Sequence, residues 1–225
     1  MRGEKAPLSR RSVIEAALSC LRTGGPGALT MRGVAALLET GAGSLYVYVR
    51  DQGELITFML DSIASEVPRP GQAGEPRARL IKLLLGYARC LYAYPGAAEL
   101  ALAHPPTGPA FLDLFESALG LLVEAGFTLN RAHHSVDALL LQVTAAISEQ
   151  DARRRDAPTQ SIPSLYAAAL DDKDPDRYPL MREARRELVE TAGEQKFAWT
   201  IRAFLDGLAA AAEPPRGRAP KKENI

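Results

Sequence analysis

Residues 29–55 read LTMRGVAALLETGAGSLYVYVRDQGEL, and this stretch decides the fold. Its apolar spacing predicts a short amphipathic helix, a tight turn, a very short helix over 42–47 and the capped start of a longer helix. The helix over 42–47 is too short for core packing to explain its residues. Helix-turn-helix proteins hold such a helix out so that its side chains enter the major groove of DNA. We therefore predict a DNA-reading segment; the alternative is a surface corner whose tyrosines lie flat against the core.

The side chains around the short helix suit DNA reading. Gly41 and Gly43 leave its start without bulky groups, so its backbone amides can approach a phosphate. Leu45 is expected to point inward as the anchor. Three side chains would offer hydroxyl groups to the DNA: Ser44, Tyr46 and Tyr48.

Composition describes an ordinary globular protein. The 225 residues are 47% hydrophobic and 24% charged, which suffices to bury a core, and the formal net charge is zero. Residues 1–50 nevertheless carry seven basic and three acidic residues. A basic amino-terminal quarter suits phosphate contacts, although ordinary fluctuation along a sequence also explains so small an excess.

Cysteine usage and hydropathy point to the cytoplasm. Cys20 and Cys90 stand among apolar neighbours in predicted helices, and we expect two buried free thiols in a reducing compartment. The polar amino terminus lacks the apolar core of a signal peptide, and the most apolar run, 138–147, is too short to span a bilayer. The expectation is a soluble cytoplasmic protein without membrane contact.

Helix signals dominate and no strand is predicted, so the fold class is all-α. An amino-terminal three-helix helix-turn-helix domain is expected over 8–66. Its first helix begins after the N-cap Ser9 and ends at the glycines of 24–27, its second is capped by Thr30 and buries Val34, Leu37 and Leu38. Asp51 and Glu54 form a predicted capping box for the fourth helix.

A Pro- and Gly-rich boundary at 68–76 precedes a larger helical domain, expected over 75–213 for ligand binding and dimerisation. Its helices are predicted near 77–93, 96–103, 108–125, 129–155, 179–192 and 194–212. Residues 156–178 mix charge with proline and are predicted to form a long, mobile connection. The tail, 214–225, is predicted to be disordered.

The motif at 29–32, with Ala35, Leu38, Ala42, the run 45–49 and Asp51, resembles the DNA-binding domain of the tetracycline repressor (TetR) family. Segments of the second domain are similar to the regulatory domain of the tetracycline repressor: 115–119, 124–127, 148–151 and 197–208. The resemblance covers most of the chain. It implies a ligand-responsive DNA-binding transcriptional regulator, released as a repressor from a palindromic operator by a small, largely apolar molecule.

The resemblance also implies the residues that face the operator: Arg32, Ala42, Gly43, Ser44, Tyr46, Tyr48, Arg50 and Gln52. Tyr46 stands where the family most regularly contacts the phosphate backbone or a base. The chain departs from the family at Glu39, where Gly is common, and at Gln52, where a phosphate-binding Lys is common. Without that Lys we expect a weaker salt dependence, or compensation by Arg10, Arg11 or Arg50. Readout would then depend on few base contacts and on Arg32.

Apolar stripes in the helices of 77–155 suit a concave pocket for a small molecule, although plain core packing also explains most of them. The residues expected to bind the ligand are Tyr87, His104, Phe111, Phe115, Leu119, Val143 and Glu149. A metal is not expected, because His133 and His134 are neighbours that point about 100° apart on a helix. The resemblance agrees: only Glu149 matches a residue near the metal of the tetracycline repressor. We expect an apolar ligand, no metal and no cofactor.

The helix over 129–155 is apolar all round near its centre, and the last helix carries a second apolar stripe. Two such helices from each subunit would form a four-helix bundle in a homodimer, as a palindromic operator requires; burial within one subunit is the competing explanation. Two other functions stay open. One is an α-helical enzyme using His104, or His133 and His134, with Glu149; the other is a helical adaptor that binds protein.

Overall fold

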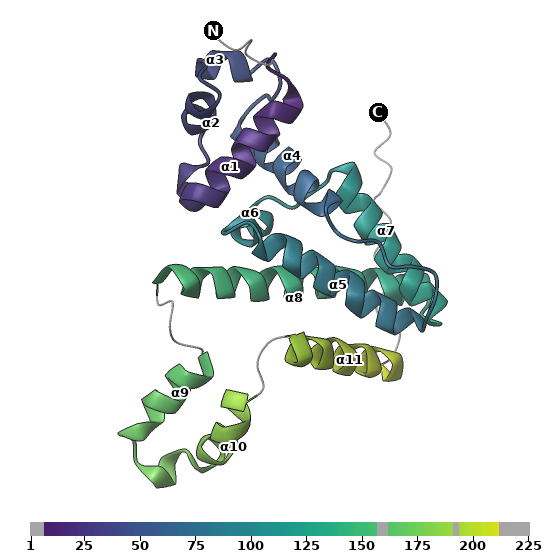
Figure 1. Cartoon of the computed structure of the whole chain (residues 1–225). Coiled ribbons are helices and arrows are strands. Elements are labelled where there is room, and N and C mark those ends of the chain that lie inside the picture. Colours follow the sequence, from purple (N-terminus) through teal and green to yellow (C-terminus); the bar gives the residue numbers. More distant parts are fainter. Residues whose placement is uncertain (1–6, 157–161, 191–193, 212–225) are drawn as a thin grey trace, which may run out of the picture.

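The computed structural model describes residues 7–156, 162–190 and 194–211, and within these ranges all regular structure is helical, as predicted (Figure 1). The helices are α1 (Arg10–Ala28), α2 (Met31–Leu37), α3 (Ala42–Leu45), α4 (Gln52–Ser65), α5 (Pro76–Tyr92), α6 (Ala97–Ala103), α7 (Pro109–Glu124), α8 (Leu129–Asp156), α9 (Ile162–Asp171), α10 (Pro179–Glu190) and α11 (Glu194–Ala210), with the 3-10 turn η1 (Pro175–Arg177) before α10. The predicted disordered tail lies outside the described residues.

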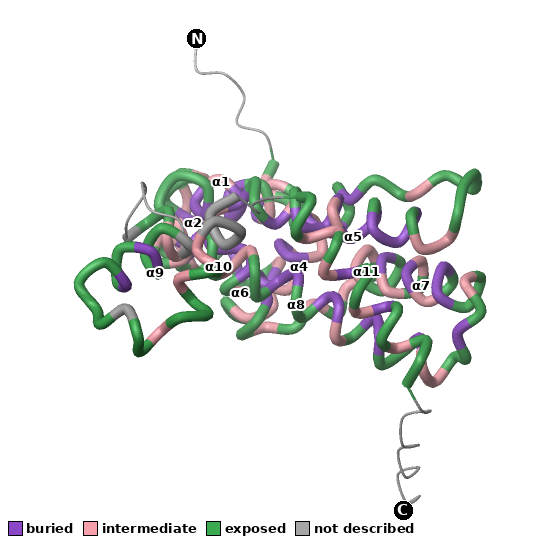
Figure 2. Tube along the Cα trace, turned by 90° about the horizontal axis from the view of Figure 1, so that it is seen from below, coloured by how far each residue is buried: buried purple, intermediate pink, exposed green. Residues whose placement is uncertain are grey.

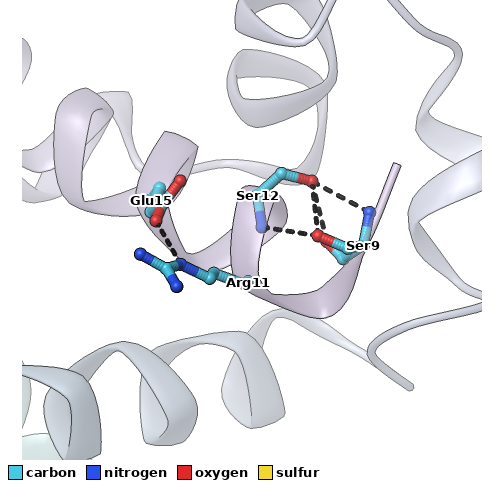
Figure 3. Close-up of polar contacts among 4 residues, drawn as sticks. All are labelled: Ser9, Arg11, Ser12 and Glu15. Carbon is cyan, nitrogen blue, oxygen red and sulfur yellow. Dashed lines mark hydrogen bonds and ion pairs between the residues drawn. The ribbon is translucent and has the colours of Figure 1, made fainter. Parts of the chain in front are cut away.

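Helix α1 begins at a reciprocal capping box. The Ser9 hydroxyl accepts the Ser12 N–H at 3.1 Å, and the Ser12 hydroxyl accepts the Ser9 N–H at 2.9 Å (Figure 3). The same figure shows the exposed ion pair of Arg11 and Glu15 one turn on, at 2.8 Å. The glycine-rich stretch interrupts α1 without ending it: Gly25 lies at φ +64°, and one further turn follows to Ala28. Ser9 is thus confirmed as the cap, and the helical path is broken where predicted.

Helix α2 begins at the predicted N-cap, where the Thr30 hydroxyl accepts the Gly33 N–H at 3.0 Å. It ends in a Schellman turn, because the Thr40 N–H donates to Ala35 O and Glu39 takes the left-handed conformation at φ +50°. That conformation favours glycine, which gives a physical reason for glycine being common at this place in the family. The prediction for Leu37 was wrong: its side chain is 53% exposed, because it falls outside the stripe that faces α1.

Helix α3 is one turn long and ends at Leu45, two residues earlier than predicted. The longer α4 begins at Asp51, whose carboxylate accepts the Glu54 N–H at 2.8 Å. The second half of the predicted capping box differs, because Glu54 accepts the backbone N–H of Arg50 rather than that of Asp51. The amino-terminal core joins α1 to α4 through fully buried side chains: Val13, Ala17, Leu21, Val34, Leu45, Leu55 and Met59.

The larger part of the chain is built around α8, which packs against α5, α6 and α7, while α11 packs on α5 and α8. Helix α4 runs from the amino-terminal helices into this body and packs along α7 (Figure 1). Gly126, at φ +90°, ends α7 and turns the chain into α8. The amino-terminal helices and the larger part of the chain therefore share one continuous core, and α4 contributes to the core of both.

Residues 156–178 were predicted to form a long, mobile connection with no helix, and the lack of a helix was wrong, because α9 and η1 lie within that range. Helices α9 and α10 pack against each other through Ala167 and Leu170, which are buried between them. The Arg182 guanidinium donates to Leu170 O at 2.6 Å and to Lys173 O at 2.7 Å, which holds the turn between the two helices. Figure 1 shows this hairpin standing apart from α8, and Figure 2 shows that the residues of α9 and of the turn after it are mostly exposed.

Both cysteines are free, as predicted, but only Cys20 is buried; Cys90 is half-buried, so the expectation of two buried thiols was wrong for it. Burial raises the pKa of the Cys20 thiol and, aided by Glu66, that of Cys90. Across the described ranges, none of the helices combines the length and the apolar character needed to cross a bilayer.

Candidate DNA interface and ligand-binding region

Helix α3 is held to the protein by two buried side chains. Leu45 is fully buried, as the inward anchor was predicted to be, and Val49 is 2% exposed. Between them, Tyr46 is 56% exposed and Val47 is 79% exposed, so these side chains are not held against the core. The alternative in which both tyrosines lie flat on the core is therefore wrong for Tyr46, whereas Tyr48 is half-buried and packs against the core. Ser44 is exposed as well, which leaves the outer surface of α3 open to a partner.

The glycines of α3 are not required by internal packing. A methyl group added to Gly41 or Gly43 would meet no atom within 4 Å, and neither residue has a positive φ. Gly33 differs, because a methyl group there would collide with the carbonyl oxygen of Ala28. The fold therefore explains the glycine at 33 but does not explain those at 41 and 43.

Two of the predicted DNA contacts are tied into the fold. The Tyr48 hydroxyl donates to Leu8 O at 2.7 Å, and the Gln52 side-chain amide donates to Leu29 O at 2.8 Å. The Arg10 guanidinium lies 4.9 Å from the ring centre of Phe58 and donates to Tyr48 O at 3.4 Å. These bonds fasten the chain before α1 and the start of α2 to the segment around α3, so they fix where the short helix sits.

The cations near α3 differ in their partners. Arg50 forms an ion pair with Glu54 at 2.9 Å while its side chain stays 83% exposed. The Arg50 backbone N–H, at 2.6 Å from the carboxylate, lowers the pKa of Glu54, and the guanidinium adds to this. Arg32, at the start of α2, is exposed. Ala42 is half-buried at the first position of α3.

In the body, the structure brings part of the predicted ligand set together. Tyr87 is 3% exposed, and its ring meets that of Phe111 edge-on, with 6.3 Å between ring centres. Its hydroxyl lies 3.4 Å from the Thr144 hydroxyl, which itself donates to Leu140 O at 2.8 Å. Burial raises the pKa of Tyr87, so the phenol stays protonated at neutral pH. Val143, beside Thr144, is buried as well.

Closer to the surface, Phe115 and Leu119 continue along α7. The Phe115 ring lies 5.7 Å from that of His133, which in turn meets His134 edge-on. A groove of about 540 Å³ opens between α7 and the start of α8, and its lining residues are Glu116, Leu119, Gly120, Val123, Leu129 and His133. Phe111 and Phe115 are half-buried and pack against the core.

The other predicted ligand residues lie elsewhere. His104 is half-buried in the turn between α6 and α7. Glu149 is exposed on α8 and pairs with Arg153 at 2.9 Å. Within the described part of the chain, three or more His, Cys, Asp or Glu side chains never gather closely enough to hold a metal ion. His133 and Glu149 lie on the same helix, about 24 Å apart along its axis, so the acid–base set of His133 and His134 with Glu149 is not assembled.

Sequence reasoning missed Thr144, a buried hydroxyl within the apolar run at 138–147. A polar residue inside such a run is the signal that could have found it, since a buried hydroxyl needs a partner. It also missed the buried carboxylate Asp151, which is 2% exposed near the end of α8.

Comparison with known proteins gives one consistent result. Residues 68–212 match the family described as "Tetracyclin repressor-like, C-terminal domain". The chain is 28% identical over 230 residues to the HTH-type transcriptional repressor DrrR1 of Streptomyces coeruleorubidus, covering 97% of this chain and 83% of that protein. It is 27% identical over 215 residues to the class D tetracycline repressor protein of Escherichia coli, covering 90% and 89%.

The solved structure of ActR from Streptomyces coelicolor, in complex with actinorhodin, matches with a TM-score of 0.81 at 25% identity, covering 91% of this chain and 97% of that one. Proteins of this kind are transcriptional regulators rather than enzymes, so the enzyme alternative has no support. The match at 68–212 spans more than half of the chain, and the relatives match over the helix-turn-helix segment too. The chain therefore belongs to the tetracycline repressor family of ligand-responsive, DNA-binding transcriptional regulators.

Proposed function

We propose that this protein is a cytoplasmic homodimeric repressor in which α3 docks in the major groove of a palindromic operator and a small, largely apolar effector binds in the body. The reading head would comprise residues 8–66 and the regulatory body residues 75–213. One observation carries the DNA half of the proposal. The outer surface of α3 combines exposed Ser44 and Tyr46 with two glycines whose missing side chains leave only open space.

That combination favours a close-fitting partner outside the protein. Glycine in a helix destabilises it by about 0.5–1 kcal/mol relative to alanine, and nothing inside the fold offsets this at Gly43. A DNA backbone that approaches α3 closely would offset this cost, because a methyl group at Gly43 would stand between the DNA and the helix. We assign Tyr46 and Ser44 to hydroxyl contacts, and Arg32, Ala42 and Gly43 to the groove or its phosphates.

The remaining DNA residues act differently in this proposal. The Arg50 side chain stays exposed and would reach a phosphate while its Nε pairs with the Glu54 carboxylate. Tyr48 and Gln52 use their polar groups on Leu8 and Leu29, so we assign them mainly to orienting α3, with any DNA contact secondary. Few direct ionic contacts then predict a shallow dependence of operator affinity on salt.

For the dimer, we propose the outer faces of α8 and α11. Leu141 on α8 is 58% exposed and Trp199 on α11 is 67% exposed, although both helices otherwise pack into the core. Exposed large apolar side chains on two adjacent helices favour a self-complementary interface. Proteins of this family act as dimers, and binding to a palindromic operator requires a dimer.

For the effector, we propose a planar aromatic molecule bound along α7 and α8. Tyr87 meets Phe111, and Phe115, one turn further along α7, lies against His133 at the groove. A flat ligand would stack or meet these rings edge-on. The similar regulator ActR has been solved in complex with actinorhodin, which supports a small-molecule effector for this chain as well. Leu119 and Val143 would line the site; His104 and Glu149 would lie at its margin or outside it.

Release would follow a population shift. Helix α4 packs along α7 and carries the reading head at its other end, so a ligand that repositions α7 changes the separation of the two α3 helices. Coupling between the two sites is reciprocal, so operator DNA would weaken effector binding by the same factor.

Gel-shift titrations with overlapping duplexes from around the protein's own gene test the proposal. We expect one palindromic duplex to bind tightly and Tyr46→Ala to weaken this binding at least tenfold while thermal stability is kept. Val47→Ala, an exposed neighbour with no polar group, is the matched control and should change affinity far less. If the wild type prefers no duplex over unrelated competitor DNA, the proposed function is wrong.

A further inference from the structure

The segment that joins α5 to α6 contacts three other elements at once. Tyr94 and Gly96 lie in it, and both are buried. From this one segment the contacts reach α1, the end of α4 and the carboxyl half of α8. It therefore touches the reading head on one side and the central helix of the body on the other.

Tyr94 forms the polar contacts to the head. Its side chain is 1% exposed, and its hydroxyl accepts from the Arg22 guanidinium at 2.7 Å and donates to the Glu66 carboxylate at 2.5 Å. The guanidinium carbon of Arg22 also lies 4.4 Å from the ring centre. Burial, with Glu66 beside it, raises the pKa of Tyr94 to about 12, so the phenol keeps the proton that it donates. One hydroxyl thus links α1 to the C-cap residue of α4.

Gly96 forms the contacts to the body and to the end of α1. It lies at φ +87°, and a side chain there would collide with the ring of Pro26. Its N–H donates at 3.0 Å to Asp151 Oδ2 on α8, and Asp151 is 2% exposed. The second oxygen of that carboxylate has no hydrogen-bond partner, and the Arg154 guanidinium lies 4.0 Å from it. The hydrogen bond that Asp151 accepts from the Gly96 N–H is what fixes the backbone of the segment against α8.

We call Arg22, Glu66, Tyr94, Gly96 and Asp151 the joint. We propose that Tyr94 is a positioning residue, which fixes the angle of the reading head on the body through Arg22 and Glu66 and so sets the separation of the two α3 helices in the dimer. The inference rests on the proposed function for its DNA readout. Without the hydroxyl, the head is still carried by α4, but its orientation is no longer fixed from two sides.

The test uses the full-length dimer and a series of operators whose half-sites are moved closer or farther apart by one and two base pairs. Wild type should bind one spacing at least tenfold better than its neighbours. For Tyr94→Phe we expect this preference to fall to threefold or less, with binding to the best spacing little changed. Glu66→Gln, at an exposed helix end, should give an intermediate profile. Tyr92→Phe removes a partly exposed phenol two residues before Tyr94 and outside the joint, and it should keep the wild-type profile.

A loss of general stability would lower affinity for every spacing alike, so the shape of the profile separates positioning from folding. A spacing preference unchanged in Tyr94→Phe would overturn the inference while leaving DNA binding intact. A second measurement does not need DNA: electron–electron resonance distances between spin-labelled residues introduced at Val47 of both subunits. The distribution of these distances should be broader in Tyr94→Phe than in wild type, and it should not be broader in Tyr92→Phe. Equal widths of the distribution in wild type and Tyr94→Phe would overturn the inference even if no operator were found.

Discussion

The reading head and the regulatory body present their functional residues in opposite ways. In the head, Leu45 and Val49 are buried so that Ser44 and Tyr46 stay outside, and the glycines at 41 and 43 border open space. In the body, the aromatic residues assigned to the effector lie in or against the core. An outward-facing site can be altered without loss of fold, whereas an inward-facing site cannot.

This difference also explains why only one of the two regions can be assigned residue by residue. A DNA-reading helix is specified by local signals, namely caps, a turn and an anchor within about twenty residues. A ligand site is specified by which helices meet, and it shares its residues with the core. The predictions below test this division, starting with the largest expected effect.

The contrast between Leu45 and Tyr46 is the strongest. Leu45→Ala should lower the free energy of unfolding by about 2–5 kcal/mol, because it removes a fully buried side chain. Tyr46→Ala should change it by less than about 0.5 kcal/mol, because the side chain is exposed. Urea unfolding followed by circular dichroism measures both. Equal losses for the two variants would mean that the tyrosine is part of the core.

Ionisation of Tyr94 in the joint should lower the free energy of unfolding at alkaline pH. The ordinary tyrosine pKa is 10.0, whereas that of Tyr94 in the folded protein is about 12. Its contribution to stability is fully present below pH 10 and is lost as the pH rises towards 12, by at most about 2–3 kcal/mol. Urea unfolding at pH 8, 10 and 11.5 should therefore show a steeper loss for wild type than for Tyr94→Phe. Tyr92→Phe should follow wild type, and parallel curves for all three would contradict the burial of this phenol.

The proposed dimer face predicts a change in assembly. Leu141→Glu introduces a charge where α8 would meet its partner, and we expect the dimer to dissociate at least tenfold more readily, which is about 1.4 kcal/mol. Sedimentation over a concentration series measures this. Leu112→Glu, at another exposed leucine on α7, is the control. A dimer that tolerates Leu141→Glu but not the control would move the interface to α7.

Glu39 offers a smaller gain in stability. Its left-handed conformation is unfavourable for a residue with a side chain, so Glu39→Gly should raise the free energy of unfolding by about 1 kcal/mol. Glu39→Ala removes the same charge but keeps the unfavourable conformation, and it should give no such gain. A similar gain from both variants would show that charge, rather than backbone conformation, limits stability here.

Much of the fold could be predicted from the sequence. The caps at Ser9, Thr30 and Asp51 were correctly identified, because each depends on a short local pattern. Helix α10 agrees with the helix predicted near 179–192, whereas α9 was missed, because its ten residues lie in a stretch that mixes charge with proline. Leu37 was misassigned because a seven-residue helix does not fix which apolar residues face inward.

The functional sites also combine features set by local sequence with contacts between residues far apart in the sequence. Burial of Leu45 was predicted from local spacing, whereas the exposure of Tyr46 decides between two alternatives that the sequence left open. The contact between Tyr87 and Thr144 joins residues 57 positions apart, and that between Arg22 and Tyr94 joins residues 72 apart. Pairs so distant in sequence depend on how α1, α5 and α8 cross, which no local pattern specifies.

The most direct test of the account is the operator affinity of Gly43→Ala. The added methyl group meets no atom of the protein, so thermal stability should be kept or slightly raised. In a close-fitting complex it would displace the DNA backbone, and overpacking of this kind costs about 1–3 kcal/mol, or roughly five- to 150-fold in affinity. Gly71→Ala, an equally open glycine in the connection before α5, should leave affinity unchanged. Wild-type operator affinity in Gly43→Ala would contradict the claim that α3 docks on DNA.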